Sequence, residues 1–322
     1  MTCSIIVATK NRPKELSTLL MPTLLAQTRA PEQIIIVDQS SDDSTKKVIE
    51  SFEASIGNGR SSTPQILYLY ETHHRGAASA RNSAIERAET DILVFLDDDV
   101  LLDPDFLQEL LAVYQQYPNA GGVSGVVTNY SRPSLPLRTM RRLFWIGRFH
   151  DERQPIYWNA ESLREHKPFR VRKFGGGVMS VKRTALNGDR FDDCYRGAGA
   201  EDIDLSWRLS ERHLLLITPR ARLVHVRTDT GRAQDHWLRY DALSNYYLYR
   251  RLWSATVWNG ACFAWLNLGY AVLATVASLR RFSLDPWRAL HAGVGDARAI
   301  LHPARSQQNQ GTPKTQIEPG TR

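Results

Sequence analysis

The first 130 residues alternate between short apolar runs rich in β-branched residues and longer segments with helical spacing, and this alternation constrains the fold more than any other feature. The strand-like runs lie at 4–8, 33–37, 65–70 and 91–96. The helix-like segments lie at 13–27, 44–56, 76–88 and 104–117. Strands that alternate with helices at this length form parallel pairs with right-handed crossovers. The sequence therefore predicts an α/β fold.

The rest of the chain has less regular patterning. Residues 131–174 are rich in arginine and aromatic residues, and we expect loops and short helices that cover one face of the sheet. Regular structure resumes at 174, with a helix that starts near 201 and two further strands, at 214–218 and 222–226. The tail at 303–322 is polar and rich in Gln, Pro and Gly, so we expect it to be disordered.

The net charge of +7 is concentrated in the middle of the chain, where residues 131–190 hold 14 Lys and Arg against five Asp and Glu. A basic region of this kind suits an anionic membrane surface or a phosphorylated substrate, unless it is only a solvated face. No aromatic and basic pattern typical of nucleic-acid binding accompanies it, so no nucleic-acid partner is expected. The N-terminus enters a strand directly and has no secretory signal pattern, which favours a cytoplasmic protein.

Residues 253–279 contain no charged side chain over 27 positions and are flanked by arginine pairs. This length is enough to span a bilayer. Asn259, Gly260, Asn267 and Gly269 interrupt the run, however, and the basic residues on both sides give no orientation. A membrane span, a membrane-seated hairpin and a buried core or dimer helix therefore remain open.

Three carboxylates, Asp97, Asp98 and Asp99, follow the apolar run at 91–96. In an open parallel sheet, ligands bind at the carboxyl ends of the strands. Residues at i and i+2 of an extended segment share a face, so Asp97 and Asp99 can converge. Two close carboxylates need a cation, and Mg²⁺ or Mn²⁺ with a diphosphate is the natural partner. The alternative is an acidic loop ahead of a helix.

Other polar residues have both a functional and a structural interpretation. Asp38 ends the second strand and either accepts hydrogen bonds from a nucleotide or caps the next helix. Glu201 and Asp202 begin a helix and serve either as a general base or as simple capping residues. His225 alternates with apolar residues and is either a core histidine or a metal ligand beside Asp99.

Taken in chain order, seven segments resemble the family 2 glycosyltransferases, which have the GT-A fold. The segments are SIIVATKNRP (4–13), Gln27, IIIVDQSSDDST (34–45), RGAASARNSAI (75–85), FLDDDVLLDPDFL (95–107), FGGGVMSVKR (174–183), and FDDCYRGAGAEDIDLSWRL (191–209) with a later His. The resemblance covers roughly residues 1–230. It implies a Rossmann-like mixed sheet flanked by helices, with a C-terminal helical, membrane-associated extension.

The resemblance also implies roles for individual residues. The nucleotide pocket would be lined by Thr9, Asn11, Arg12 and Asp38, with Arg81 and Asn82 nearby. Asp97 and Asp99 would form the D-x-D pair, with Asp99 the direct metal ligand, His225 a further ligand, and Asp98 in contact with the ribose or the sugar. Asp202 would be the catalytic base with Glu201 beside it, and Trp207 and Arg208 would border the acceptor site.

The implied activity is an inverting, metal-dependent transfer of a sugar from a nucleotide-diphospho-sugar, with UDP the commonest donor in the family. The acceptor would be a glycan or lipid-linked hydroxyl used in cell-surface polysaccharide synthesis. No Q-x-x-R-W motif and no helix bundle are present, which favours single addition over processive synthesis. Gln39 after Asp38 departs from the family pattern, which leaves the sugar and the acceptor open.

The expected organisation is a catalytic domain at 1–230, divided into a nucleotide-binding half at 1–130 and an acceptor half at 131–230. A helical extension would follow at 231–302. We expect association with the cytoplasmic face of the inner membrane, with a homodimer as another option for the helical part. Two rival classes are a haloacid dehalogenase-type phosphatase with Asp97 as nucleophile, and a non-catalytic binding protein on the same fold.

Overall fold

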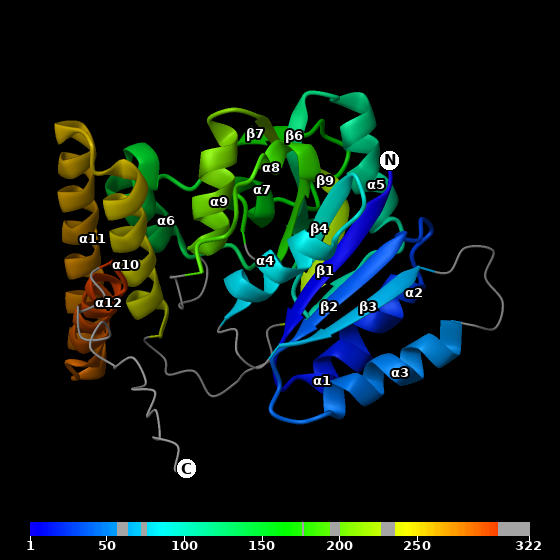
Figure 1. The fold of residues 1–322 in the computed structure, drawn as a ribbon. Helices are drawn as coiled ribbons and strands as arrows, with labels where there is room; N and C mark the ends of the chain where they lie inside the picture. The colour runs from blue at the N-terminus through cyan, green and yellow to red at the C-terminus, as the bar shows by residue number, and fades with distance from the viewer. Residues whose placement is uncertain (57–63, 72–75, 176, 194–199, 227–235, 302–322) are drawn as a thin grey trace, which may run out of the picture.

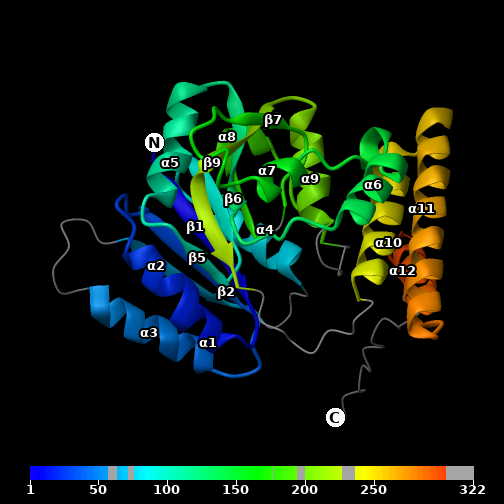
Figure 2. The same cartoon turned by 180° about the vertical axis from the view of Figure 1, so that it is seen from behind.

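The computed structural model describes residues 1–322 except 57–63, 72–75, 176, 194–199, 227–235 and 302–322. A nine-stranded mixed sheet lies at its centre with helices on both faces, and a layer of helices stands beside it (Figure 1). The same two parts are seen from behind in Figure 2. The predicted disordered tail at 303–322 lies outside the described residues.

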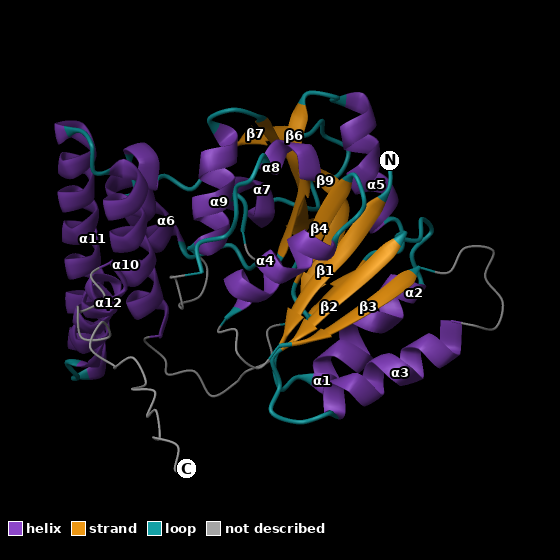
Figure 3. Ribbon diagram, viewed as in Figure 1, coloured by secondary structure: helices purple, strands orange, loops and turns teal. Residues whose placement is uncertain are grey.

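The secondary structure is shown by type in Figure 3. The strands are β1 (Cys3–Thr9), β2 (Gln33–Asp38), β3 (Gln65–Tyr70), β4 (Ile92–Leu96), β5 (Val100–Leu102), β6 (Ala120–Val127), β7 (Phe169–Val171), β8 (Val178–Lys182) and β9 (Leu214–His225). The α-helices are α1 (Pro13–Glu15), α2 (Met21–Leu25), α3 (Ser44–Ile56), α4 (Ala77–Arg87), α5 (Phe106–Gln116), α6 (Leu135–Phe144), α7 (Gln154–Trp158), α8 (Arg183–Leu186), α9 (Glu201–Ser210), α10 (His236–Leu248), α11 (Val257–Arg281) and α12 (Asp285–Leu301). The remaining turns are the π-helical η1 (Leu16–Leu20) and η3 (Tyr249–Trp253) and the 3-10 turn η2 (Gly147–Phe149).

The sheet has the strand order β3-β2-β1-β4-β8-β6-β9-β5, with β7 also paired to β9. The first four strands of this order are parallel, as the strand and helix alternation predicts. Strand β8 then runs antiparallel to both β4 and β6. The carboxyl ends of β1, β2 and β4 therefore meet at one edge, where the acidic residues begin.

Alternate residues of each strand enter two different cores. In β1, Ile5 and Val7 pack with the side of the sheet that η1, α2 and α5 cover. Ile6 packs on the opposite face with α4, α7 and α9. The runs that look fully apolar in the sequence are thus strands buried on both faces.

The prediction of two separate strands at 214–218 and 222–226 is wrong, because β9 is one continuous strand from Leu214 to His225. Pro219 lies inside it, at a register shift between Ile217 and Arg222 in the pairing with β6. A proline cannot donate a ladder hydrogen bond and is tolerated at such an irregularity. The first half of β9 pairs with β7 and the last residues pair with β5.

The basic middle of the chain covers the sheet only in part, which corrects the prediction for 131–174. Helix α7 joins the core beneath the sheet, but α6 packs on α11 instead. The Phe144 and Trp265 rings lie 5.0 Å apart, and Trp265 Nε1 donates to the Leu143 carbonyl at 2.8 Å. A Cβ at Gly269 would lie 2.6 Å from Phe144, so this contact requires glycine.

A third core belongs to the C-terminal helices, and its members include Trp207, Tyr247, Trp253 and Tyr270. Helix α11 is long and apolar enough to cross a membrane, by length and composition alone. Within its apolar window, 28% of the residues are buried against the protein. The helix therefore packs on the molecule along one side and exposes apolar side chains on the other.

Candidate functional site

The three consecutive acids after β4 point in two directions. Asp97 and Asp99 face His225, and the ligand atoms of these three residues all lie within 4.8 Å of one another. His225 Nε2 is 2.9 Å from Asp99 Oδ1 and 3.9 Å from Asp97 Oδ2. Asp98 points away and accepts a hydrogen bond from Thr9 Oγ1 at 2.7 Å. The shared face predicted for Asp97 and Asp99 is present.

The pairing of β5 with β9 positions His225. Residue Val100 lies opposite His225, directly after Asp99. The Val226 N–H donates to the Asp99 carbonyl at 2.9 Å. The Asn129 side chain brackets the His225 backbone, since its Nδ2 donates to the carbonyl at 2.8 Å and its Oδ1 accepts from the N–H at 3.1 Å. Asn129 has no sequence signal of its own and was not predicted.

The cluster of Asp97, Asp99 and His225 fits a divalent cation. Two carboxylates and one imidazole form a donor set that suits Mn²⁺ and related ions. Gly177, with a φ of +62°, lies against this cluster, and a Cβ there would come within 3.4 Å of Asp97 Oδ2 and His225 Nδ1. These distances are ordinary contacts, so the positive φ is the reason that glycine is favoured at position 177.

Arg12 neutralises the other side of the acidic group. Its guanidinium lies 2.8 Å from Asp98 Oδ1 and 2.7 Å from Asp99 Oδ2. Burial alone would raise the pKa of Asp99, but the hydrogen bonds from His225 and Arg12 outweigh it and hold that pKa well below its usual range. For Asp98, burial dominates and raises the pKa to about 7. The three acids are therefore electrostatically distinct although they are consecutive.

The turn after β1 brings Arg12 to this position. Asn11 adopts the left-handed conformation, with a φ of 54°. Its side-chain oxygen accepts the Ser41 N–H at 2.9 Å, and its own N–H donates to Ser40 Oγ at 2.7 Å. Asn is one of the few residues other than glycine that tolerates this backbone conformation. Asn11 thus connects the ends of β1 and β2.

Arg81 connects the metal-type cluster to the start of α9. Its Nη2 lies 3.2 Å from Asp97 Oδ1, and its Nη1 lies 2.8 Å from Asp202 Oδ1 and 3.3 Å from Glu201 Oε1. The Arg81 side chain is buried, as are Glu201 and Asp202. The second Asp202 oxygen, Oδ2, is also buried and has no hydrogen-bond partner within the described residues. Arg81 thus holds one oxygen of Asp202, and the described contacts leave the other without a donor.

Asp38 lies at the predicted edge but is fully buried. Its Oδ1 accepts the Ser40 N–H at 2.9 Å, and its Oδ2 accepts the Tyr68 hydroxyl at 2.8 Å. Both oxygens therefore already have a donor, and the same contacts fit the capping interpretation. Burial, followed by the hydrogen bond to Asp38, raises the pKa of Tyr68 far above its usual value.

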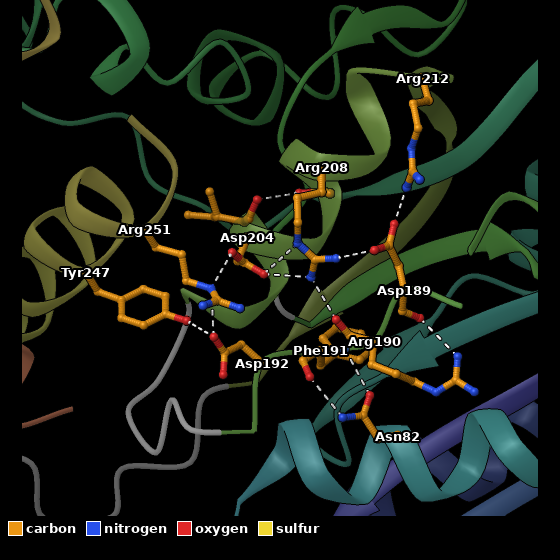
Figure 4. A network of polar contacts seen from close by, with 12 residues as sticks. Asn82, Asp189, Arg190, Phe191, Asp192, Asp204, Arg208, Arg212, Tyr247 and Arg251 are labelled. Atoms are coloured by element: carbon orange, nitrogen blue, oxygen red, sulfur yellow. Dashed lines mark hydrogen bonds and ion pairs between the residues drawn. The ribbon is translucent and has the colours of Figure 1, made fainter. Parts of the chain in front are cut away.

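Asn82 and Arg208 belong to a separate polar network on the other side of α9 (Figure 4). Asn82 exchanges two hydrogen bonds of 2.9 Å with the Phe191 backbone. Arg208 lies between Asp204, at 2.7 Å, and Asp189, at 2.8 Å. These contacts tie α4, α9 and the segment at 189–192 together. The roles predicted for Asn82 near the nucleotide pocket and for Arg208 at the border of the acceptor site stay predictions.

Trp207 faces away from Arg208 and joins the core of the C-terminal helices. Leu205 and Leu209 on the same helix pack against the sheet. Helix α9 therefore carries Glu201 and Asp202 at its start, the sheet core on one side and the helical core on another. Trp207 and Arg208, which the sequence places at the border of the acceptor site, thus lie on different faces of α9, and their role there stays a prediction.

A mixed sheet with acidic metal-type ligands after its fourth strand and a carboxylate pair at a nearby helix start defines the GT-A class of nucleotide-sugar transferases. The model for "Glycosyl transferase family 2" matches residues 4–176, and the chain belongs to this family. The family and the fold class predicted from the sequence are confirmed, as is the enzyme class. The match also excludes the alternative of a haloacid dehalogenase-type phosphatase.

Curated relatives include a validoxylamine A glucosyltransferase from Streptomyces hygroscopicus subsp. limoneus, 30% identical over 226 residues that cover 64% of this chain and 47% of the relative. The chain thus spans about half the length of that relative. The succinoglycan biosynthesis protein ExoM of Rhizobium meliloti (strain 1021) is 27% identical over 302 residues, which cover 89% of this chain and 90% of ExoM.

Solved structures with a similar fold include the mannosyltransferase PcManGT from Pyrobaculum calidifontis in complex with GDP-Man and Mn²⁺. Its TM-score is 0.60 at 17% identity, with 92% of this chain and 86% of that chain covered. S. aureus TarS 1–349 in complex with UDP-GlcNAc has a TM-score of 0.56 at 16% identity, with 93% and 81% covered. At these identities the likeness shows the fold alone.

Proposed function

We propose that this protein transfers a sugar from a nucleotide-diphospho-sugar to a hydroxyl of a glycan or lipid-linked acceptor, with inversion at the anomeric carbon. The observation that carries the proposal is the connection of two acidic groups through one buried arginine. Arg81 contacts Asp97 of the metal-type cluster and Asp202 at the start of α9. A donor site and a base held this close are what a single displacement requires.

Asp97, Asp99 and His225 would hold the cation, and Mn²⁺ is the first ion to test. When bound, the cation would neutralise charge on the diphosphate leaving group. Solved structures of the same fold were obtained with Mn²⁺, among them PcManGT with GDP-Man and the transferase GalNAc-T7 with UDP and GalNAc. UDP is the first nucleotide to test, and TarS 1–349 was solved with a UDP-sugar.

Asp202 is proposed as the base. Its carboxylate would take the proton of the acceptor hydroxyl while that oxygen bonds to the anomeric carbon and the bond to the diphosphate breaks. Arg81 would hold one Asp202 oxygen and leave Oδ2 free for this proton. Glu201 would assist as a second partner of Arg81. Proton transfer by a positioned side chain contributes typically about 10²- to 10⁴-fold to the rate.

Thr9, Asn11 and Arg12 would act at the nucleotide side. Thr9 and Arg12 both contact Asp98, and the Asn11 N–H donates to Ser40 Oγ. Asp38 would contribute indirectly, by orienting the Tyr68 hydroxyl and the Ser40 backbone. Asp98 would contact the ribose or the sugar. This requires Asp98 to bind the donor while it also contacts Thr9 and Arg12.

The test is thermal unfolding of the purified protein with UDP, GDP, dTDP or CMP, with and without Mn²⁺. A ligand present at a hundred times its dissociation constant stabilises the folded state by about 2.7 kcal/mol. We expect a shift with one nucleotide that needs Mn²⁺ and disappears in Asp99→Asn. Asp103→Asn, a nearby acid outside the cluster, is the matched control and should keep the shift. A shift that persists in Asp99→Asn would overturn the metal site.

For the cellular context, we propose polysaccharide synthesis at the cytoplasmic face of the inner membrane. Two relatives are named as polysaccharide biosynthesis proteins, ExoM and the O-antigen biosynthesis protein RfbC of Myxococcus xanthus. The catalytic unit would be 1–230 and the helical extension 231–302. Exposed apolar residues of the extension, Val257 at 93% and Phe282 at 97%, would enter the lipid surface beside Arg280 and Arg281.

Fractionation of cells tests this location. The full chain should sediment with membranes, and a chain truncated before residue 253 should lose that association. A truncated chain that stays in the membrane fraction would contradict the proposal, because the exposed apolar helix would then not be the anchor.

A further inference from the structure

A cavity of ≈ 680 Å³ lies where the catalytic part meets the C-terminal helices. Its walls come from η2, the segment after β7, the middle of α9 and the start of α11. None of the acidic residues of the proposed metal site or of the proposed base lines it. The cavity is therefore a feature that the donor site does not account for.

Three cations surround one indole ring in this cavity. The ring of Trp207 lies 5.1 Å from Arg148 Cζ, 5.7 Å from Arg172 Cζ and 5.7 Å from Lys173 Nζ. Within the described residues, no carboxylate forms an ion pair within 4.0 Å of any of the three. The acid in the wall, Glu152, accepts the main-chain N–H of Arg172. The charges of Asp151 and Glu152 favour the protonated form of Lys173, but Asp151 is already paired with Arg153 at 2.8 Å. The three cations therefore outnumber the acid in the cavity wall, and a bound anion would offset this excess of positive charge.

Lys173 is the most buried of the three cations, and backbone oxygens hold its amine. Lys173 Nζ donates to the Arg148 carbonyl at 2.6 Å and to the His150 carbonyl at 2.8 Å. Burial lowers the pKa of Lys173 to about 8, which leaves the amine mostly protonated at neutral pH. Since an ammonium group has three N–H donors, one remains after these two bonds.

One further donor and the start of a helix lie at the same cavity. The indole N–H of Trp207 is buried and has no hydrogen-bond partner within the described part of the chain. Thr256 caps α11, whose first turn also lines the cavity, and its Oγ1 accepts the Asn259 N–H at 3.1 Å. The positive end of a 25-residue helix dipole thus adds to the three side-chain charges.

The cavity is close to the proposed base. Trp207 follows Asp202 on α9 by five residues, which is about 7.5 Å along the helix axis. This axial distance is within the reach of one acceptor molecule, although Asp202 and Trp207 leave the helix in different directions. At the cavity, Trp258 is 64% exposed, so an apolar surface adjoins the cations.

We propose that this cavity binds a phosphate ester group of the acceptor. The inference rests on the proposed function in one respect, namely that Asp202 marks the acceptor side. A phosphate has the charge and the acceptor oxygens that two arginines, a lysine and a helix start can satisfy together. Soluble esters and lipids both carry such a group, and the experiment separates these two sources.

The test compares two double variants of the full chain. R148Q/R172Q removes two charges from the cavity. R132Q/R170Q removes two charges from exposed arginines in the same basic stretch, outside the cavity. R148K/R172K keeps both charges and distinguishes loss of binding from loss of folding.

Calorimetric titration with glycerol 3-phosphate and with inorganic phosphate, in EDTA and without nucleotide, measures the soluble ligands. Flotation with phosphatidylcholine vesicles, with and without phosphatidic acid, measures the lipid form.

We expect R148Q/R172Q to bind at least one phosphate probe about tenfold or more weakly than the native chain, since a hydrogen bond to a charged group contributes appreciably to binding. R132Q/R170Q and R148K/R172K should stay within a few-fold of the native chain. Binding of glycerol 3-phosphate indicates a soluble ester. Binding only to vesicles with phosphatidic acid indicates a lipid. If R148Q/R172Q and R132Q/R170Q bind every probe equally, or the native chain binds none, the proposal is overturned.

The same proteins are also melted with UDP, GDP, dTDP or CMP in the presence of Mn²⁺. The nucleotide shift should be unchanged in R148Q/R172Q, because the cavity shares no residue with the metal-type cluster. A native chain that binds phosphate but shows no nucleotide shift would refute the proposed donor site and leave the anion site standing. A nucleotide shift without phosphate binding would refute the anion site and leave the proposed donor site standing.

Discussion

The carboxyl end of the sheet and the C-terminal helical layer bury their polar groups in different ways. At the sheet, Asp97, Asp98, Asp99 and Asp202 are all matched by Arg12 or Arg81. In the helical layer, aromatic rings and small residues make most of the contacts. Ion pairs therefore dominate the contacts at the sheet edge, whereas the packing of apolar side chains dominates in the helical layer. Substitutions should therefore act through electrostatics in one region and through packing in the other.

The largest effect is expected for Asp202→Asn, which keeps the shape of the side chain and removes its basicity. Sugar transfer should fall by about 10³-fold, and the nucleotide-dependent thermal shift should remain. Asp189→Asn, in the segment that contacts Arg208 of the same helix, is the control and should keep its turnover. Steady-state kinetics checks this. Turnover of Asp202→Asn within tenfold of the native rate would show that another group takes the proton.

Arg81→Gln tests the balance of charges at the sheet edge. Removing one partner from buried ion pairs costs about 3–5 kcal/mol, because it leaves the opposite charges unpaired. Mn²⁺ should restore part of this free energy of unfolding, since Asp97 would regain a positive partner. The exposed pair of Arg239 with Asp296 supplies the contrast, and Arg239→Gln should cost less than about 1 kcal/mol. Urea unfolding with and without Mn²⁺ measures both. Equal stability of the two variants would remove the distinction between the regions.

Two glycines of α12 test packing in the helical layer. A Cβ at Gly293 would lie 2.2 Å from the Arg239 carbonyl oxygen, whereas a Cβ at Gly295 would meet nothing within 4 Å. Gly293→Ala should therefore force α12 from α10 and cost about 1–3 kcal/mol. Gly295→Ala should stabilise the protein by about 0.5–1 kcal/mol through helix propensity alone. Thermal unfolding compares them, and a Gly293→Ala protein as stable as Gly295→Ala would mean that the helices do not pack this closely.

Asp241 on α10 differs from the acids of the sheet edge. It lies in the helical layer and has no ion pair within 4.0 Å in the described residues. Burial raises its pKa from 3.8 to about 6. The folded state therefore holds the proton more tightly than the unfolded state, and stability falls as the pH rises from 3.8 to about 6.

Asp241→Asn should remove this dependence and should be more stable than the native protein above pH 6, by about 1 kcal/mol because the side chain is only partly buried. Unfolding measured from pH 4 to pH 7 gives the difference. A constant difference over this range would show that Asp241 does not titrate between the two values.

The extent to which the fold could be predicted differs between the same two regions. Local apolar runs such as 33–37 and 91–96 specify buried strands, and Asp97 and Asp99 follow from the periodicity of an extended chain. The continuity of β9 across Pro219 depends on the bulged pairing with β6, which no local pattern contains. The packing of α6 on α11 joins Phe144 with Gly269 across more than 100 residues, and it was missed for the same reason.

The site was predicted in part. Residue types indicated Asp97, Asp99 and His225, and the structure brings them together. The contact of Arg81 with Asp202 and the contact of Arg12 with Asp98 are long-range pairs that a single sequence does not specify. Helical periodicity alone could have separated Trp207 from Arg208. The excess of positive charge at 131–190 did indicate a cationic surface, and Arg148, Arg172 and Lys173 of the cavity come from it.

The register of strand β9 fixes the position of His225. Its first half is aligned by β6 and β7, and its last residue, His225, is aligned by Val100 of β5. Neighbouring residues of a strand point to opposite faces, so gain or loss of one residue between Thr218 and Ala221 would turn His225 away from Asp99 unless the bulge absorbed the change. The segment 218–221 is distant in sequence from Asp97 and Asp99, yet its length determines whether His225 reaches them.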